Sequence, residues 1–336
     1  MFSKKNIVKF LSTVALTAVM TTSAFAAKPK FVFKFGTIVP GTHADCIAAN
    51  KVFKKSLEEG SNGRIKFELY PNAQLGGDRE MVEACQLGVL DGCLPAGSTL
   101  VGFDKRFQML ALPYLFRDRE TAFKSLDGKV GQTLNSHLPE IGLVGLGFTE
   151  NGFRHVSNNR GPINTPEDMK GIKLRTMENP MHLAYFKAIG ANPTPMAWGE
   201  LYTALQQGVV DGEENPAALV NEARFYEVQK YYSKTGHVFS ACDIIVSKVF
   251  FDSLPEDLQK VLIESAKKYA AAQRKEIIKQ ERESFEALKE NGMILNEISP
   301  ENREKFAELA APLYSQFKEE IGDELYQMAM ELQKNN

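Results

Sequence analysis

The sequence predicts an α/β protein built from two similar lobes. The main observation is a repeat: the octet CQLGVLDG at residues 85–92 recurs as LQQGVVDG at residues 205–212, with five of eight positions identical. Each copy closes an apolar-periodic helix, and Gly88 and Gly208 suit the left-handed position at which a helix ends. The copies are 120 residues apart, too long a period for a solenoid, which favours two lobes with a cleft between them. A chance match of eight residues is the alternative.

The first lobe shows alternating strand and helix patterns. Strands are predicted over residues 31–38 and 65–70, with an apolar-faced helix between them. The first repeat adds a helix over residues 81–87 and then a short β-branched run, which we expect to be a buried strand. Such alternation implies a mostly parallel sheet with helices on both faces.

The second lobe is predicted to follow the same plan. It contains a strand at residues 171–176, a helix over about residues 180–189, and the second repeat, whose helix includes residues 201–205. Two crossings connect the lobes, an irregular polar stretch at residues 149–160 and a segment around residues 236–243. Because two segments cross, closure of the lobes is expected to be a hinge motion.

An unusually long helix follows the second crossing. Ser253 and Glu256 are expected to form a capping box around Pro255, and an apolar track then continues without a breaker to Gly292. About 37 residues at 1.5 Å each give roughly 55 Å, which is longer than a small domain. This helix is therefore predicted to span both lobes, and two C-terminal helices are predicted to pack back as covering layers.

The N-terminus has the features of a secretory signal peptide over residues 1–26. Lys4, Lys5 and Lys9 precede or begin an apolar stretch, and small residues lead to a cleavage site after Ala26. A membrane anchor would need about 20 apolar residues, which is more than this stretch offers. The mature protein is therefore expected to be soluble and exported to a bacterial periplasm.

The mature chain is long enough for two domains. Removing residues 1–26 deletes three lysines and no acids, so the formal charge moves from −2 to −5. Lobe I is expected to comprise residues 27–151 plus about 240–280, and lobe II residues 152–239 plus about 281–336. This charge predicts no nucleic-acid partner, and no apolar stretch after the signal peptide is long enough to embed the protein in a membrane.

Four cysteines leave the redox chemistry open. Cys46, Cys85, Cys93 and Cys242 could pair in three ways in an oxidising compartment. The first three are expected to share a lobe. Buried free thiols that act as small hydrophobic side chains are an equally good alternative.

Polar residues near the carboxyl ends of predicted strands mark the candidate binding site, because ligands of open α/β sheets bind beyond those ends. Four residues lie at such ends, in a crossing or in a post-strand loop: Arg175, Asn215, Arg154 and His43. A guanidinium offers a planar two-donor fork that matches a carboxylate, so Arg175 predicts a small organic acid as ligand. The alternative is that Arg175 is a surface residue paired with Glu178 or Asp168.

Enzyme and metal motifs are absent or poor. The sequence contains no H-E-x-x-H, no G-x-S-x-G and no Walker loop, and the glycines at residues 142–147 do not open a helix. His43 with Cys46, and Cys85 with Cys93, lack the spacing of a zinc site. We therefore predict no catalytic residue, no metal and no cofactor.

Several strings, taken in order, resemble one known family over nearly all of the mature chain. They are GRIK at 63–66, YPNAQLGGDR at 70–79, ALPY at 111–114, DMKGIKLR at 168–175, NPTPMA at 192–197, ELYTALQQGVVDG at 200–212 and NP at 215–216. The family is that of the periplasmic solute receptors of tripartite ATP-independent (TRAP) transporters. The resemblance implies a two-lobed periplasmic binding protein fold, type II-like, with a long hinge-spanning helix. It also implies a receptor that is no enzyme and that delivers its ligand to the TRAP membrane permease subunits.

The resemblance assigns roles to individual residues. Arg175 matches the arginine that forms a salt bridge with the ligand carboxylate, and Arg154 matches a second arginine of the acidic-sugar receptors. Asn215 matches the asparagine that helps to hold the carboxylate. Trp198 matches an aromatic residue against which the ligand packs, and Asp78 a polar contact.

The sequence departs from the sialic-acid receptors of this family at Ala96, where they have an acid that contacts the ligand. His43, Asp45, Asp78 and Asp243 are expected to supply donors and acceptors for hydroxyl groups instead. We therefore expect a monocarboxylate sugar acid of the hexuronate or aldonate type. The alternatives are a C4-dicarboxylate or keto-acid receptor, a periplasmic sensor input module, and a hydrolase or isomerase that uses His43 and Asp78 as acid and base.

Overall fold

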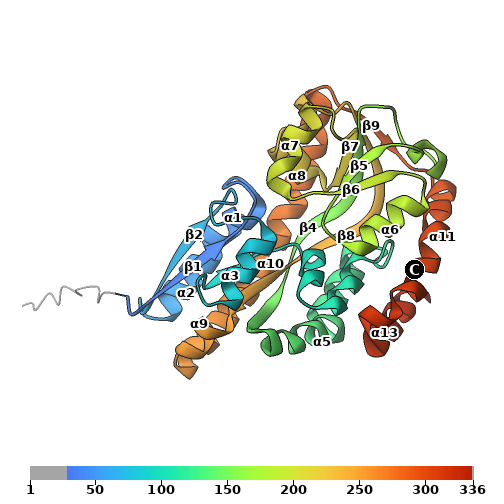
Figure 1. Ribbon diagram of the computed structural model, residues 1–336. Coiled ribbons are helices and arrows are strands. Elements are labelled where there is room, and N and C mark those ends of the chain that lie inside the picture. The colour runs from blue at the N-terminus through green and yellow to red at the C-terminus, as the bar shows by residue number, and fades with distance from the viewer. Residues whose placement is uncertain (1–28, 335–336) are drawn as a thin grey trace, which may run out of the picture.

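The computed structural model describes residues 29–334, so the predicted signal peptide lies outside the described residues. A single sheet of nine strands forms the centre, with helices on both faces (Figure 1). The strands are β1 (Phe31–Gly36), β2 (Ile65–Tyr70), β3 (Gly92–Cys93), β4 (Leu143–Asn158), β5 (Lys173–Thr176), β6 (Asn192–Pro195), β7 (Gly212–Asn215), β8 (Tyr231–Ser247) and β9 (Ile294–Glu297).

The helices alternate with these strands along most of the chain. Those before β4 are α1 (Ala44–Ala48), α2 (Lys54–Gly60), α3 (Asp78–Gln86), α4 (Arg119–Asp127) and α5 (Lys129–His137). Those after β4 are α6 (Pro180–Ala188), α7 (Trp198–Gln206), α8 (Ala217–Glu222), α9 (Lys248–Ser253), α10 (Glu256–Glu290), α11 (Pro300–Gln316), α12 (Lys318–Ile321) and α13 (Asp323–Lys334). None of the helices described between residues 29 and 334 combines the length and the apolar character needed to cross a membrane.

The two copies of the repeat have the predicted helix ends. Gly88 follows α3 with φ 70° and Gly208 follows α7 with φ 68°, so both adopt the left-handed conformation. The prediction that buried strands follow at once is wrong, because Val89 and Val209 are 76 % and 54 % exposed. Their N–H groups donate back to the preceding helices, and the strands begin only three residues later.

The sheet is mixed, whereas the sequence predicted a mostly parallel one. The strand order is β2-β1-β3-β8-β4-β7-β5-β6, with β9 paired to β8. Parallel pairs occur at both ends, β1 with β2 and β3, and β5 with β6 and β7. The two predicted crossings are long strands, β4 and β8, which pair antiparallel and shift register near Gly145, Glu150 and Arg154. The sheet is therefore continuous through both lobes, and the predicted irregular stretch is mainly strand.

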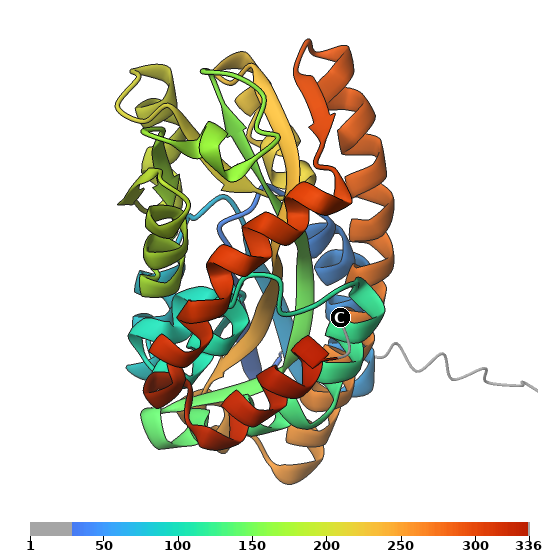
Figure 2. The same ribbon diagram turned by 90° about the vertical axis from the view of Figure 1, so that its right-hand side faces the viewer.

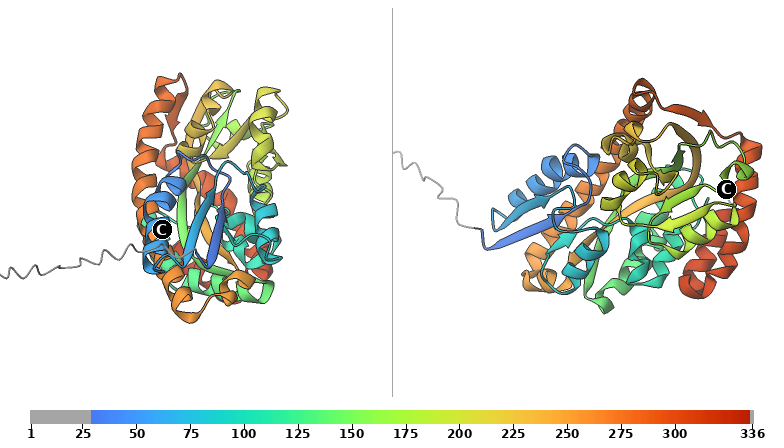
Figure 3. Two further views of the ribbon diagram at one scale, coloured as in Figure 1. Left: turned by 90° about the vertical axis from the view of Figure 1, so that its left-hand side faces the viewer. Right: turned by 45° about the horizontal axis from the view of Figure 1, so that its top comes forward.

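Helix α10 is the predicted long helix, with 35 residues, and it runs along the whole molecule beside the sheet (Figures 2 and 3). The predicted capping box is wrong. Ser253 is the last residue of α9, its hydroxyl donates to the Phe250 carbonyl at 2.6 Å, and Pro255 stands at the N-cap of α10. Near the C-terminus, α11 packs on α6 and α13 packs on α5, so this segment touches both ends of the molecule. The exact division into lobes stays a prediction.

An aromatic cluster attaches the first strands to α10. The rings of Phe53 and Tyr269 stack with their centroids 5.1 Å apart, and Phe33 and Phe35 pack against Phe53. All four cysteines are buried free thiols. The Sγ atoms of Cys85 and Cys93 lie 3.6 Å apart.

Candidate functional site

The candidate site is a pocket between the two repeat units. It holds about 780 Å³, including its opening to solvent. Its lining comes from the first lobe, from β4 and from the second lobe, and it includes five of the eight predicted site residues. These five are Asp78, Arg154, Arg175, Trp198 and Asn215.

Arg175 lies at the carboxyl end of β5, an interior strand flanked by β6 and β7. The side chain is only 3 % exposed, and its Nε donates to the Met196 carbonyl at 2.9 Å. Neither terminal nitrogen has a hydrogen-bond or ion-pair partner between residues 29 and 334. Burial, with a smaller contribution from the nearby Arg154 charge, lowers the pKa of Arg175 to about 10. The alternative that pairs Arg175 with Glu178 or Asp168 is therefore wrong, and a buried guanidinium fork faces the pocket.

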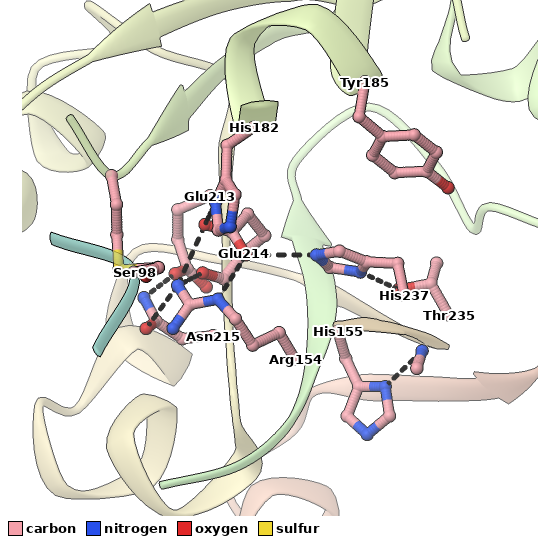
Figure 4. A network of polar contacts seen from close by, with 12 residues as sticks. Ser98, Arg154, His155, His182, Tyr185, Glu213, Glu214, Asn215, Thr235 and His237 are labelled. Atoms are coloured by element: carbon pink, nitrogen blue, oxygen red, sulfur yellow. Dashed lines mark hydrogen bonds and ion pairs between the residues drawn. The ribbon is translucent and has the colours of Figure 1, made fainter. Parts of the chain in front are cut away.

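Arg154, in contrast, is held by the protein. Its Nε and Nη2 donate to the Glu214 carboxylate, and Nη2 also donates to Asn215 Oδ1 at 2.9 Å (Figure 4). His237 Nε2 contacts the same carboxylate at 3.1 Å, and His182 lies on another side of it (Figure 4). Burial alone would raise the pKa of Glu214, but the Arg154 charge and the imidazole contacts hold it well below its usual range.

Both ends of the Asn215 amide are engaged within the protein. Its oxygen accepts from Arg154, and its Nδ2 donates to Glu213. The Glu213 carboxylate also accepts from Ser157 Oγ at 2.6 Å, and burial raises its pKa to about 7. Asn215 thus orients Arg154 here, and a direct contact between Asn215 and a ligand stays a prediction.

The wall opposite Arg175 carries carboxylate and amide oxygens. Asp78 begins α3, and its Oδ2 accepts from the Ala96 N–H at 3.1 Å, while Oδ1 is buried without a partner in the described part of the chain. Burial raises the pKa of Asp78 to about 7, although the Ala96 hydrogen bond and the Arg175 charge lower it in part. Asn151 of β4 also lines the pocket, and its buried Oδ1 has no partner among the residues that the structure describes.

Trp198 supplies an aromatic wall. It begins α7, is half-buried, and lies against Phe225 with ring centroids 5.5 Å apart. Trp198 is the only tryptophan in the sequence, so its fluorescence reports on this pocket alone.

Three predicted site residues do not line the pocket. His43 is fully buried at the N-cap of α1, where its Nδ1 accepts at 3.3 Å from the N–H of Asp45, which is also buried. Asp243 is buried in β8 opposite Phe148, and burial raises its pKa well above the usual range. Each polar side chain thus lies inside the fold and outside this pocket, and the structure does not bring His43 and Asp78 together in it.

The sequence reasoning missed three kinds of residue at the site. Asn151 had a signal, because it is a polar residue three positions before Arg154 in the same strand. Glu213 and Glu214 had one as well, because two acids in a short buried strand require partners. His182 and His237 had none, since their positions depend on how distant strands and helices pack.

Residues 35–320 match the family described as bacterial extracellular solute-binding protein, family 7. The chain belongs to this family. A relative, the 2,3-diketo-L-gulonate-binding periplasmic protein of Escherichia coli, is 37% identical over 290 residues, covering 86% of this chain and 87% of the relative. The C4-dicarboxylate-binding periplasmic protein of Rhodobacter capsulatus is 34% identical over 332 residues, covering 96% and 97%.

A solved structure agrees in fold. The TRAP periplasmic solute binding protein of Polaromonas sp. JS666, bound to D-erythronate, has a TM-score of 0.85 and 39% identity, covering 89% of this chain and 98% of that one. The predicted membership of the TRAP solute receptors and the two-lobed α/β fold are therefore confirmed.

Proposed function

We propose that this family member is a periplasmic receptor that closes on a monocarboxylate sugar acid, of the hexuronate or aldonate type, and delivers it to the membrane permease of a TRAP transporter. The observation that carries the proposal is the buried Arg175, whose terminal nitrogens have no partner among residues 29–334, in a pocket that also holds side-chain oxygens without partners in the same range. The secretory signal predicted at the N-terminus supports the periplasmic location.

The carboxylate of the ligand binds Arg175. Two parallel N–H···O bonds match the guanidinium geometry, and hydrogen bonds to charged groups contribute about 1.5–3 kcal/mol each. A buried cation without an ion-pair partner is costly, so a carboxylate that neutralises Arg175 gains affinity from relieving that cost. Arg154 is already neutralised by Glu214. Of these two arginines, Arg175 is thus the one whose charge a ligand carboxylate would neutralise.

The remainder of the ligand faces Asp78 Oδ1 and Asn151 Oδ1. Asn151 Oδ1 is an acceptor, and Asp78 Oδ1 is an acceptor whenever that carboxyl is ionised, so each then needs a donor once water is expelled. Sugar hydroxyls supply such donors. The second carboxylate of a C4-dicarboxylate supplies none, and it would approach the Asp78 carboxyl. These contacts favour a polyhydroxy acid over a dicarboxylate or a simple keto acid.

The named ligands of the relatives support an organic acid and include both classes. One relative is named for a sugar-derived acid and the solved structure holds an aldonate, whereas another relative is named for C4-dicarboxylates. We propose further that the protein binds its ligand without altering it. His43, the base of the enzymatic alternative, lies outside the pocket that contains Asp78.

Tryptophan fluorescence tests the proposal. We expect the mature protein, freed of carried-over ligand, to show a saturable change with galactonate or glucuronate and a much weaker response to succinate. Arg175→Ala should weaken binding about a hundredfold or more, and Arg175→Lys should also weaken it, because an ammonium cannot replace the fork.

Arg282→Ala is the matched control, because Arg282 is an exposed arginine on α10 away from the pocket. Tight binding of succinate alone would overturn the sugar-acid assignment while leaving the receptor intact. Near-normal binding by both Arg175 variants would remove Arg175 from its assigned role.

A further inference from the structure

A second pocket lies on the opposite side of β4 from the ligand pocket. Arg154 and His155 are successive residues of this strand, and Arg154 lines the ligand pocket whereas His155 lines the second one. His155 lines a hollow of about 570 Å³ that opens to solvent between β4, β8, α10 and α11. Figure 4 shows its ring turned away from the network around Glu214, and Figure 2 shows α11 crossing this side of the molecule.

His155 presents a hydrogen-bond donor to this pocket. The Gly236 N–H donates to Nδ1 at 2.9 Å, so Nδ1 is the unprotonated nitrogen and a neutral ring carries its proton on Nε2. The side chain is 7 % exposed, and burial together with nearby cations holds its pKa well below the usual range, which keeps the ring neutral. Within residues 29–334, the Nε2–H has no acceptor.

Basic side chains outnumber acidic ones around the pocket. The cations in its lining are Arg117, Arg119, Lys234 and Arg303, and the acids are Glu281 and Glu297. Four minus two leaves an excess of two positive charges in the lining, and Asp118, which pairs with Arg117 at 3.0 Å from outside the lining, offsets one of them. Glu150, which pairs with Arg119 from outside the lining, reduces that excess when it is ionised. At most one positive charge around the pocket is therefore left for an anion to neutralise.

Arg303 is the cation best placed to hold such an anion. Lys234 is paired with Glu297 at 2.7 Å and Arg119 with Glu281 at 2.6 Å, whereas Arg303 has no ion pair within the described chain. Its guanidinium lies against Gly236, where an added Cβ would be 3.5 Å from Nη1. Gly236 adopts a left-handed conformation with φ 56°. The Arg303 guanidinium therefore lies beside the residue whose N–H donates to His155 Nδ1.

We propose that this second pocket binds a small oxyanion, phosphate or carboxylate in kind, between the Arg303 guanidinium and the His155 Nε2–H. An oxyanion accepts from both groups at once, and the donor from His155 excludes a cation from the same position. The site is separate from the ligand pocket and does not depend on the sugar-acid assignment. The two pockets are joined by one segment of β8, because Lys234 and Gly236 line the second while His237 reaches Glu214 behind the first.

Calorimetric titration of the ligand-free mature protein with inorganic phosphate, and separately with acetate, tests the proposal. In chloride buffer we expect saturable one-to-one binding of at least one of the two anions. Comparing the two titrations shows whether the pocket prefers a tetrahedral anion or a carboxylate. Arg303→Gln should weaken that binding about tenfold, the loss of one charge-assisted hydrogen bond. The ¹⁵N resonance of His155 Nε2 should move during the titration.

Two further variants make the outcome decisive. Lys305→Gln removes an equal charge from the same helix outside the pocket and should change little. Arg175→Ala should retain the phosphate or acetate affinity. The proposal is overturned if neither anion binds at millimolar concentration, if Lys305→Gln weakens binding as much as Arg303→Gln, or if Arg175→Ala abolishes it, since the anion would then occupy the ligand pocket.

Discussion

The two repeat units have the same backbone but different chemistry. In the first unit, the N–H groups of Gly88 and Val89 donate to the carbonyls of Cys85 and Ala84 at 3.1 and 2.9 Å. The second unit repeats both hydrogen bonds, with the same lengths, 120 residues later. These paired bonds satisfy the last carbonyls of each helix, which is why a glycine stands at each of these positions.

The other repeated residues also have structural tasks. Asp91 Oδ2 accepts from the Lys34 N–H at 2.9 Å, and Asp211 Oδ2 accepts from the Lys173 N–H at 2.9 Å. Each aspartate thus ties its unit to the neighbouring parallel strand. At Gly212 an added Cβ would lie 2.2 Å from the Ser157 carbonyl oxygen, so only glycine allows the strands to approach. The repeated residues therefore maintain the backbone structure of each unit.

The two units differ in the three residues that follow the repeat. After Gly92 the chain continues with Cys93-Leu94-Pro95, which is buried and apolar except for its backbone. After Gly212 it continues with Glu213-Glu214-Asn215, which is buried, charged and bonded to Arg154. Arg175 and the acids that hold Arg154 therefore lie around the second unit, while Asp78 lies at the start of α3 in the first unit. Under the proposed function, the two units close around one ligand that carries both a negative charge and hydroxyl donors.

The largest loss of stability is expected from Glu214→Gln in the second unit. The amide keeps the shape of the side chain but leaves Arg154 as a buried cation without an ionised partner. Removing one member of a buried ion pair costs about 3–5 kcal/mol of unfolding free energy. Urea unfolding of the ligand-free protein measures this loss.

Leu94 occupies the equivalent position in the first unit and provides the matched control. Leu94→Met nearly conserves the volume of a buried apolar side chain, so we expect a loss below about 1.5 kcal/mol. If the two variants lose equal stability, the polar network contributes no more than the apolar packing opposite it, and the contrast between the units fails.

Two buried acids, one in each unit, sharpen the comparison through pH. Burial raises the pKa of Asp78 and of Glu213 to about 7, above their unfolded values near 4. Between about pH 4 and 7 the folded protein holds protons that the unfolded chain has released, so the unfolding free energy falls as pH rises through that window. Each carboxyl contributes its own part of this decrease in unfolding free energy, and Asp78→Asn or Glu213→Gln should abolish that part. The part is on the order of 2–4 kcal/mol at pH 8 and little at pH 4.

Urea midpoints measured from pH 4 to pH 8 check this expectation. Profiles that stay parallel to that of the unsubstituted protein would show that neither carboxyl is protonated in the fold. Ligand titration then separates the pair. Asp78 lines the pocket and Glu213 does not, so only Asp78→Asn should weaken sugar-acid binding directly.

What the sequence predicted correctly depends on local signals. The helix-ending glycines, the long helix and the position of Arg175 after a strand follow from short-range patterns, and five lining residues were found from them or from the resemblance. The Glu214 network was missed because Arg154 and Glu214 are 60 residues apart and meet only when β4 pairs with β7. Asp243 was misjudged for a related reason, since the register of β8 decides which face a strand residue occupies.

The smallest expected effect compares the helix-ending glycines directly. Alanine in the left-handed conformation costs roughly 1–2 kcal/mol, so Gly88→Ala and Gly208→Ala should each lose about that much in urea unfolding. The loss should be larger for Gly88→Ala. A Cβ at position 88 would lie 3.2 Å from the Val249 side chain, whereas a Cβ at position 208 meets nothing within 4 Å. Adding Gly88→Ala to the Val249→Ala variant should therefore lower its unfolding free energy by as much as Gly208→Ala lowers that of the unsubstituted protein. If Gly208→Ala is the more damaging change, something other than the backbone sets the cost, and the two units are not equivalent scaffolds.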